Sequence, residues 1–387
     1  MDKNFFGKLF PWNFNFWARS QGVIGIDIGS SSIKIVQLKK ENEQAVLETY
    51  GELAVGPYAK RLVGQVTQLS EEAMISALKD LLKESGANAK SAIIATPIRD
   101  GFVTILELPL VQGSQMDEVV KFEARKYIPV PLSDVEMDWV VLNSSSKSRE
   151  VEEAGENGGD NENEILEKDN QRKNYKKTVS VLLAVVSKEI IQKYKNIVTG
   201  AGLKIKSFEI EIFSVWRSSR FRQITPVMTI DLGASSTKMS VVDNGVLMAS
   251  HAVGRGAQEL TDAISKSLGV GFQRAEEMKR EIGLSPRPEY GELVGVLESV
   301  LNFIFSEAKQ FMLAYRRKYN SSVGQVVMVG GGASLKGIVD VAVKELGVEV
   351  VTADPFSKTE YPPFLQEILK EIGPSFSVAI GLALKSL

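Results

Sequence analysis

Apolar residues recur along the chain with two spacings, and each spacing predicts one kind of element. Continuous apolar runs predict buried strands over Val23–Ile28, Ile93–Thr96, Val227–Leu232, Val241–Val242 and Val326–Val329. Apolar residues three and four positions apart predict helices over Ser70–Ser85, Ser187–Thr199 and Gly291–Tyr319, the last as one helix or two in series. A further helix is expected from Ser114 to no later than Pro129. Strands mixed with helices favour an α/β architecture.

The first twenty residues do not follow these patterns. They are rich in Phe and Trp, and Pro11 prevents a continuous helix through them. Aromatic rings beside Lys3, Lys8 and Arg19 suit a membrane surface or a partner protein. A tail that packs on its own domain or stays disordered is the competing interpretation.

Residues 143–177 form a second exceptional segment, between strand-like runs at Asp138–Leu142 and Val179–Val186. Acidic residues dominate its first part and basic residues its end, while apolar residues are sparse. Such a composition does not bury enough apolar surface to fold, so a long disordered hairpin loop is expected. Its role is either regulatory or that of a solvated insertion.

The most informative feature is an internal repeat. Residues 27–34 read DIGSSSIK and residues 231–238 read DLGASSTK, so that Asp, Gly, two Ser and Lys recur in register. Each copy follows an apolar strand and leads into a second strand, a polar turn and a third strand. This context predicts the same antiparallel β-meander twice. One copy would be typical of an ordinary hairpin turn, but two copies in matching context favour a function.

The repeated turns have the chemistry of a polyphosphate site. Gly29 and Gly233 allow close backbone approach, and turn amides with the hydroxyls of Ser30, Ser31, Ser235 and Ser236 donate to phosphate oxygens. Lys34 adds a positive charge, whereas Lys238 is expected only to mirror Lys34 and to face solvent. Asp27 and Asp231 would repel phosphate, so they are interpreted as ligands of Mg²⁺ through water. Two such hairpins facing each other would hold a polyphosphate from both sides.

A third motif, VVMVGGGASLKG at residues 326–337, joins an apolar strand to a helix expected to start near Ser334. Three glycines let a flat ligand lie against the backbone near the helix N-terminus. The motif matches neither the dinucleotide fingerprint nor the P-loop pattern.

Composition narrows the classes of function. The chain has no Cys and a single His, which excludes thiolate chemistry and makes a histidine-based triad or multi-histidine metal site untenable. A net charge of −2 does not indicate a nucleic-acid partner. No apolar run reaches the length of a membrane span, and the N-terminus does not read as a signal peptide, so a cytoplasmic protein is expected.

These motifs, in this order, resemble the actin-like ATPase superfamily. Asp27–Lys34 resembles its first phosphate loop, Asp231–Lys238 its second and Gly330–Gly337 its adenosine loop. The resemblance implies two lobes around a cleft that binds ATP and Mg²⁺. It also implies nucleotide contacts from Glu276 and Lys279, which lie in an AEEMK segment, and from Gly331 and Gly332. Glu276 and Lys279 are equally interpretable as an exposed helical ion pair. Segments 211–218 and 379–383 resemble the two connecting helices.

The run EARKYIPVPL at residues 123–132, followed by residues 134–142, is similar to the PilM family of type IV pilus assembly proteins. The family's organisation implies subdomain 1A at residues 21–97 and 191–222 and an inserted 1C at 98–190. Subdomain 2A would be 223–269 and 323–387, with a helical 2B at 270–322. The tail 1–20 and the acidic insertion depart from the family pattern.

The resemblance also implies a partner. Proteins of this family bind the short N-terminal cytoplasmic tail of PilN, a bitopic inner-membrane protein, in a groove between 1A and 1C. This chain is therefore expected to be a cytoplasmic scaffold, peripheral to the inner membrane through its partner and other pilus assembly platform proteins, with a nucleotide-dependent conformation.

The same resemblance gives Glu211 a catalytic role in orienting a nucleophile, against its reading as an ordinary acid at a helix start. ATP binding with slow or absent hydrolysis is expected. Two alternatives remain. One is a filament-forming division protein like FtsA, although this sequence ends at Leu387 without the C-terminal amphipathic helix of FtsA. The other is a small-molecule kinase of the same fold.

Overall fold

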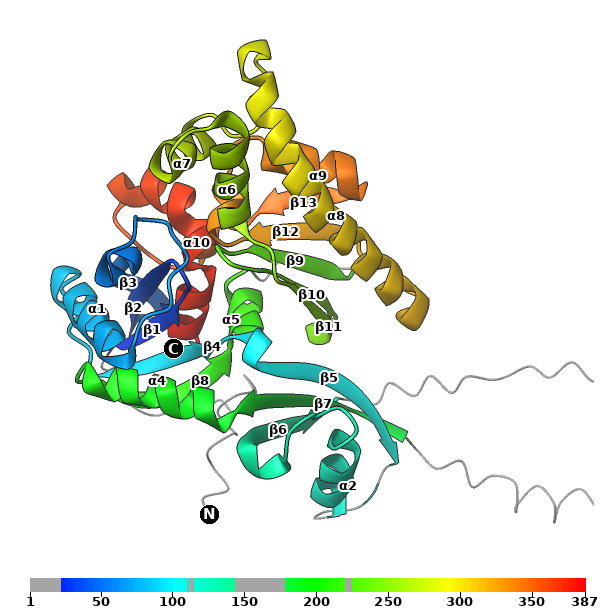
Figure 1. The fold of residues 1–387 in the computed structure, drawn as a ribbon. Helices are drawn as coiled ribbons and strands as arrows, with labels where there is room; N and C mark the ends of the chain where they lie inside the picture. Colours follow the sequence, from blue (N-terminus) through cyan, green and yellow to red (C-terminus); the bar gives the residue numbers. More distant parts are fainter. Residues whose placement is uncertain (1–21, 110, 112–114, 143–177, 220–224) are drawn as a thin grey trace, which may run out of the picture.

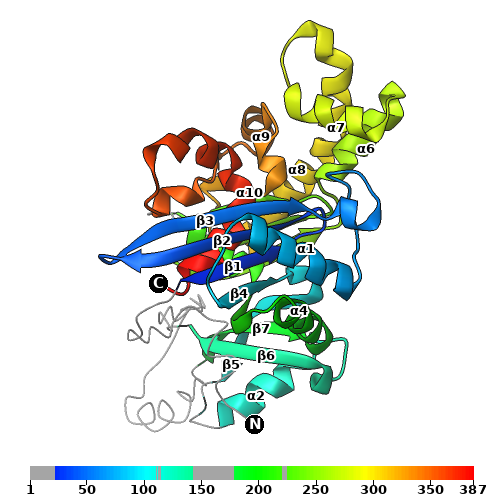
Figure 2. The same ribbon diagram turned by 90° about the vertical axis from the view of Figure 1, so that its left-hand side faces the viewer.

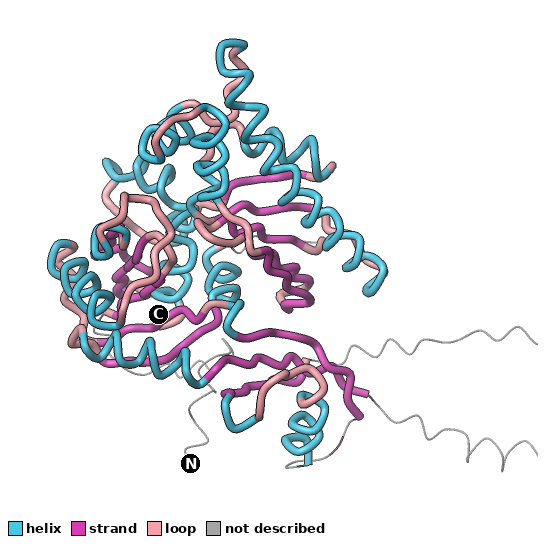
Figure 3. The backbone as a smooth tube through the Cα atoms, in the orientation of Figure 1, coloured by secondary structure: helices cyan, strands magenta, loops and turns pink. Residues whose placement is uncertain are grey.

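Two five-stranded sheets with the same strand topology form the centre of the fold (Figure 1). The computed structural model describes residues 22–109, 111, 115–142, 178–219 and 225–387. The tail 1–20 and the insertion 143–177 therefore lie outside the described residues. Helices cover the sheets, and a third, smaller sheet extends from the first one (Figure 3).

The two large sheets repeat one plan. The first has the order β3-β2-β1-β4-β8, with β1 (Val23–Ile28), β2 (Ser32–Glu41), β3 (Gln44–Ala54), β4 (Ser91–Thr96) and β8 (Lys204–Ile210). The second has the order β11-β10-β9-β12-β13, with β9 (Val227–Leu232), β10 (Thr237–Asp243), β11 (Val246–Val253), β12 (Gln325–Val329) and β13 (Glu349–Thr352). In each sheet three strands pair antiparallel and the remaining two join in parallel. The predicted double meander is confirmed, and the duplication extends to the parallel strands.

Helices from distant parts of the sequence enclose the first sheet. Helices α1 (Glu71–Glu84) and α4 (Lys188–Gly200) pack side by side on one face (Figure 2), and α10 (Gln366–Leu384) packs on β1, β2 and β4. The predicted start of α1 is confirmed, because the Ser70 hydroxyl accepts a hydrogen bond from the Ala73 amide at 3.3 Å. The short helix α5 (Glu211–Ser218) contacts α10 and the ends of β4 and β8.

The second sheet has its own helices: α6 (Ala257–Leu268), α7 (Phe272–Glu281), α8 (Gly291–Tyr319) and α9 (Ile338–Leu346). The segment 291–319 is one continuous helix rather than two. The helix after the three glycines begins at Ile338, not near Ser334, because Gly331–Ser334 form a 3-10 turn first. Among the described residues, no helix combines the length and apolarity that crossing a membrane requires.

The small sheet has the antiparallel order β5-β7-β6, with β5 (Gly101–Pro109), β6 (Val135–Val141) and β7 (Thr178–Ser187). Helix α2 (Gln115–Ala124), which ends before Pro129 as predicted, packs on it through Met116, Val120 and Ala124. Strands β6 and β7 flank residues 143–177 and pair antiparallel, so the hairpin predicted there is confirmed.

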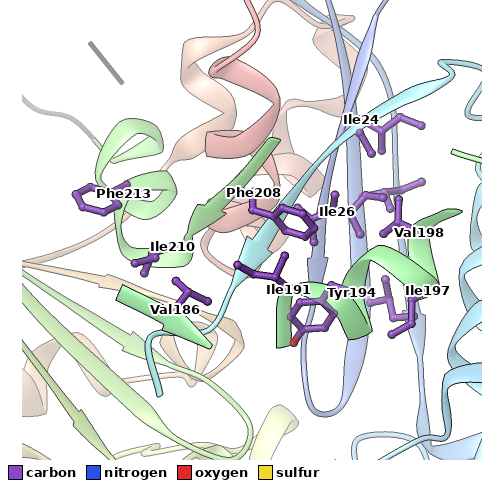
Figure 4. Close-up of a cluster of buried hydrophobic side chains, with 14 of the residues drawn as sticks. Ile24, Ile26, Val186, Ile191, Tyr194, Ile197, Val198, Phe208, Ile210 and Phe213 are labelled. Carbon is purple, nitrogen blue, oxygen red and sulfur yellow. The ribbon is translucent and has the colours of Figure 1, made fainter. Parts of the chain in front are cut away.

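The small sheet and the first sheet share one apolar core. Residues from both meet in a single cluster, in which Val186 of β7 lies near Ile210, and which also includes the α4 residues Ile191 and Tyr194 (Figure 4). Ile24 and Ile26 of β1 belong to the same cluster. Because apolar packing is dense and continuous across the junction, a displacement of one sheet requires the other to repack.

Helices α5 and α10 cross without room for a side chain. A Cβ atom built on Gly381 of α10 would lie 1.9 Å from the Ser214 carbonyl oxygen of α5. An ion-pair network fixes the same crossing: the buried Glu209 carboxylate accepts from Arg217 at 2.7 and 2.9 Å and pairs with Lys385 at 2.8 Å. Burial alone would raise the pKa of Glu209, but Arg217 and Lys385 lower it. The two helices thus form one rigid unit behind both sheets.

This crossing yields a stability prediction. Gly381→Ala should lower the free energy of unfolding by at least about 2 kcal/mol, because the new methyl group meets a backbone atom that cannot rotate away. Gly295→Ala is the matched control, since Gly295 lies in α8 with open space around its Cβ position. That control should be neutral or stabilising by about 0.5–1 kcal/mol. Denaturant unfolding of both variants measures the difference, and equal stability of the two would contradict the close crossing.

Candidate functional site

A cavity of about 420 Å³ lies between the two large sheets. Its walls come from the β1–β2 and β9–β10 turns, the start of α5, helices α6 and α7, the glycine turn after β12 and the middle of α10. All residues singled out from the sequence line this one cavity: Asp27, Gly29, Ser30, Ser31, Lys34, Glu211, Asp231, Gly233, Ser235, Glu276, Lys279, Gly331 and Gly332. The structure therefore brings together residues that lie up to about three hundred positions apart in the sequence.

The two repeated turns have the same hydrogen bond and face each other. In one, the Gly29 amide donates to the Ser32 carbonyl at 3.0 Å, and in the other the Gly233 amide donates to Ser236 at 3.0 Å. The Ser30 hydroxyl donates to the Ser235 hydroxyl at 3.0 Å, which joins the turns across the cavity. Amides and hydroxyls converging from two sides make a site suited to an oxyanion.

An acidic centre, formed by Glu211 and Asp231 around Lys238, lies next to the turns. The Lys238 ammonium is 2.7 Å from the Glu211 carboxylate and 3.1 Å from the Asp231 carboxylate. The three side chains are only 17%, 6% and 12% exposed, respectively. The expectation that Lys238 only mirrors Lys34 and faces solvent is wrong: Lys238 is an ion-paired residue of the cavity wall.

The charges of this centre shift its titration. Burial lowers the pKa of Lys238 by itself, but Asp231 and Glu211 outweigh burial and raise it well above the ordinary range. Burial raises the pKa of Asp27 to about 6, although Lys34 and Lys238 act against the shift. Lys34 itself bonds the Ser32 hydroxyl at 2.7 Å and pairs with Glu52 of β3 at 3.0 Å. The cavity wall therefore places two ammonium groups beside four carboxylates, those of Asp27, Glu52, Glu211 and Asp231.

Glu211 connects this centre to the small sheet. One carboxylate oxygen pairs with Lys238, and the other accepts a buried hydrogen bond from the Ile98 amide at 3.0 Å. Ile98 begins the short 3-10 turn Ile98–Asp100, which connects the end of β4 at Thr96 to the start of β5 at Gly101. Both oxygens of Glu211 thus have a partner. The side chain connects Lys238 of the second sheet to the segment that leads into β5 of the small sheet.

At the opposite end of the cavity, Glu276 and Lys279 of α7 form an internal pair at 2.6 Å. Glu276 also accepts from the Thr261 hydroxyl at 2.6 Å and from Arg280 at 2.7 Å. Their side chains are only 13% and 12% exposed, so the interpretation as an exposed surface pair is wrong. Burial by itself would raise the pKa of Glu276, but Lys279 and the hydrogen bonds lower it, and burial lowers the pKa of Lys279.

The glycine turn after β12 has room for a flat group on one side only. Gly330 has a positive φ of 83°, and a Cβ there would lie 2.3 Å from Asp231. A Cβ on Gly332 would lie 2.3 Å from the Leu232 side chain, whereas Gly331 faces open space. The glycines thus pack the turn against β9 and leave a bare backbone surface toward the cavity.

A loop from the first sheet closes over the cavity, and sequence reasoning missed it. The Val66 amide donates to the Gln258 side chain of α6, and a Cβ on Gly64 would lie 3.6 Å from the Glu276 carboxylate. Nothing in the local sequence of Gln258 marks it, because its role depends on a loop almost 200 positions away. Lys238 did carry a signal, since it repeats Lys34 in register.

Asp27 and Asp231, which the sequence predicts to contact magnesium through water, both line the cavity. Among the described residues, no group of three or more acidic or histidine side chains is arranged to hold a metal directly. The Asp27 side chain is half-buried and lines the cavity. Asp231, in contrast, is already paired with Lys238. A hydrated ion brought by a ligand fits this pattern, because Mg²⁺ keeps several waters and needs few carboxylates.

Comparison with known proteins identifies the relatives of this arrangement. The profile of the family described as type IV pilus assembly protein PilM matches residues 25–154 and 165–387. The solved structure of a PilM–PilN type IV pilus biogenesis complex superposes with a TM-score of 0.75, at 23% identity over 95% of this chain and 99% of that chain. MreB5 of Spiroplasma citri bound to ADP superposes with a TM-score of 0.55, at 12% identity over 95% and 96% of the two chains. The predicted actin-like ATPase fold is confirmed.

Curated relatives are cell division proteins FtsA. The protein of Enterococcus faecalis is 22% identical over 84% of this chain and 77% of its own length. The protein of Streptococcus pneumoniae is 26% identical over 44% of this chain, and that match spans only 41% of its own length.

Proposed function

Because the chain belongs to the PilM family of type IV pilus assembly proteins, we propose that it is an ATP-binding scaffold of the pilus assembly machinery. The observation that carries this proposal is the convergence of both repeated turns, the glycine turn and the α7 pair on one cavity. A cavity built from two copies of one turn offers donors to a polyphosphate from both sides. The pocket of a small-molecule kinase would need a second substrate site, and no described feature suggests one.

The cavity supports a specific orientation of ATP. Its phosphates would lie between Gly29, Ser30 and Ser31 on one side and Gly233 and Ser235 on the other, with Lys34 beside them. The adenosine would lie against the bare backbone of Gly331 and Gly332, near Glu276 and Lys279.

Magnesium accompanying the nucleotide would meet Asp27 through its waters and neutralise phosphate charge, whereas Asp231 is already paired with Lys238. The related MreB5 structure, bound to ADP, supports a nucleotide in this fold.

The partner would be the N-terminal cytoplasmic tail of a PilN-like inner-membrane protein. The chain of the PilM–PilN complex that superposes on this protein shares its fold over 95% of this chain and 99% of that chain. We place the tail between the first sheet, as subdomain 1A, and the small sheet, as subdomain 1C. Binding there would locate the chain in the cytoplasm at the inner membrane, together with other proteins of the assembly platform.

A physical connection between the two sites supports nucleotide-dependent partner binding. Glu211 joins Lys238, beside the phosphate turn, to the Ile98 amide at the root of the small sheet. Because the first and small sheets share one apolar core, a change in their relative position requires that core to repack into a second arrangement. Because both oxygens of Glu211 are engaged, its proposed role in orienting a nucleophile requires it to leave one partner, which suits slow hydrolysis.

The FtsA relatives support a second candidate, a filament-forming division protein. The two candidates share the nucleotide site and differ in partner. Binding of a PilN tail favours the first, and copolymerisation with the division-ring polymer would favour the second.

The nucleotide proposal predicts the effect of removing one charge. Lys34→Met should weaken ATP binding at least about tenfold, because a charge-assisted contact to phosphate is lost. Lys40→Met is the matched control on the same strand, since Lys40 pairs with Glu43 at 2.6 Å and does not line the cavity. Isothermal titration with ATP and Mg²⁺ measures both variants. An equal effect of the two changes would place ATP elsewhere.

The partner proposal predicts a coupling between two ligands. A labelled peptide with the sequence of the PilN cytoplasmic tail should bind with affinities that differ at least about fivefold between ATP-saturated and ATP-free protein. In Glu211→Gln, which keeps an acceptor for the Ile98 amide but removes the ion pair, this difference should disappear. Fluorescence anisotropy gives the affinities. Equal affinities in the unmodified protein would disprove the coupling, and no binding in either state would disprove the partner.

A further inference from the structure

The acidic centre contains its own cation. We propose that the Lys238 ammonium takes over most of the charge compensation that magnesium would otherwise supply, so that nucleotide binding depends only weakly on Mg²⁺. This inference rests on the proposed function, because it concerns the same cavity. It assigns to the second copy of the repeated turn a different task from that of the first.

The two lysines of the repeat are equivalent in sequence and differ in partners. Lys34 pairs with Glu52, whose side chain is 44% exposed, at the edge of the cavity. Lys238 pairs with two carboxylates, Glu211 and Asp231, which are almost fully buried. A buried carboxylate without a counter-charge is costly, so the position between Glu211 and Asp231 requires a cation. Lys238 supplies that cation from within the chain.

The ammonium also lies where phosphate chemistry needs a positive charge. Its Nζ atom is 4.0 Å from the Cβ position of Gly233, in the second of the two turns that face each other. An ammonium has three N–H donors, and Glu211 and Asp231 accept two of them. The remaining donor is suited to a phosphate oxygen brought next to Gly233. One lysine thus neutralises the carboxylates that would repel phosphate and contacts phosphate itself.

A divalent ion would compete for the same ligand. The Asp231 oxygen that Lys238 contacts at 3.1 Å cannot also be fully available to an ion and its waters. Magnesium loses water reluctantly and requires near-octahedral geometry, so a short ion pair already in place disfavours its entry. Removing the ammonium should reverse this preference, because Glu211 and Asp231 would lose their shared counter-charge and a hydrated divalent ion could replace it.

The test compares ATP binding with Mg²⁺ and with EDTA in the unmodified protein and in Lys238→Met. The unmodified protein should lose less than about threefold in affinity when Mg²⁺ is removed, whereas Lys238→Met should lose at least about tenfold. A tenfold loss in the unmodified protein, or the same ratio in both proteins, would overturn the proposal. Lys40→Met serves as the control for loss of one positive charge and should behave as the unmodified protein.

A second measurement does not depend on ATP. Mn²⁺ binding to nucleotide-free protein, followed by electron paramagnetic resonance, should be detectable in Lys238→Met and at least about tenfold weaker in the unmodified protein. Equal Mn²⁺ affinity would overturn the assignment. If the unmodified protein binds no ATP under either condition, the proposed nucleotide function fails, and the Mn²⁺ result alone decides the role of Lys238. Should Lys238→Met not fold, Lys238→Gln, which keeps two N–H donors for Glu211 and Asp231 without the charge, takes its place in both measurements.

Discussion

The ion pairs of Lys238 with Glu211 and Asp231 link the two sides of the cavity. They lie beside an apolar cluster in which Val23 and Ile93 of the first sheet meet Val227 and Val327 of the second. Asp231 and Lys238 belong to the second sheet, while Glu211 begins the helix that follows the first. Together with the hydrogen bond between Ser30 and Ser235, they close the floor of the cavity from both sides. Behind them, α5 and α10 cross at Gly381 with their backbones in contact. The molecule therefore combines a rigid crossing with a polar, exchangeable contact, which is the arrangement that a ligand-controlled closure needs.

Much of this architecture could be predicted because the chain repeats itself. The two copies of the Asp-Gly-Ser turn indicated the double meander and placed Asp27, Gly29, Asp231 and Gly233 at one site. Local signals were equally reliable where the physics is local. Ser70 caps α1 as expected, and the apolar spacing over 291–319 corresponds to one helix.

The features that could not be predicted depend on contacts distant in the sequence. The partners of Lys238 come from residues 7 and 27 positions away on different elements, so its burial has no local pattern. The second bond of Glu211, to the Ile98 amide, joins residues 113 positions apart. The three glycines indicated a close backbone turn correctly, but the 3-10 geometry of Gly331–Ser334 delayed the following helix to Ile338.

The proposed role of nucleotide is to control the contact between the two large sheets across the cavity. The chain contains no cysteine, so a spin-label pair at Lys79→Cys on α1 and Gln273→Cys on α7 would be unique. Double electron–electron resonance at saturating ATP and Mg²⁺ should give a shorter and narrower distance distribution than the nucleotide-free protein. Identical distributions, in a sample shown by titration to bind ATP, would contradict the claim.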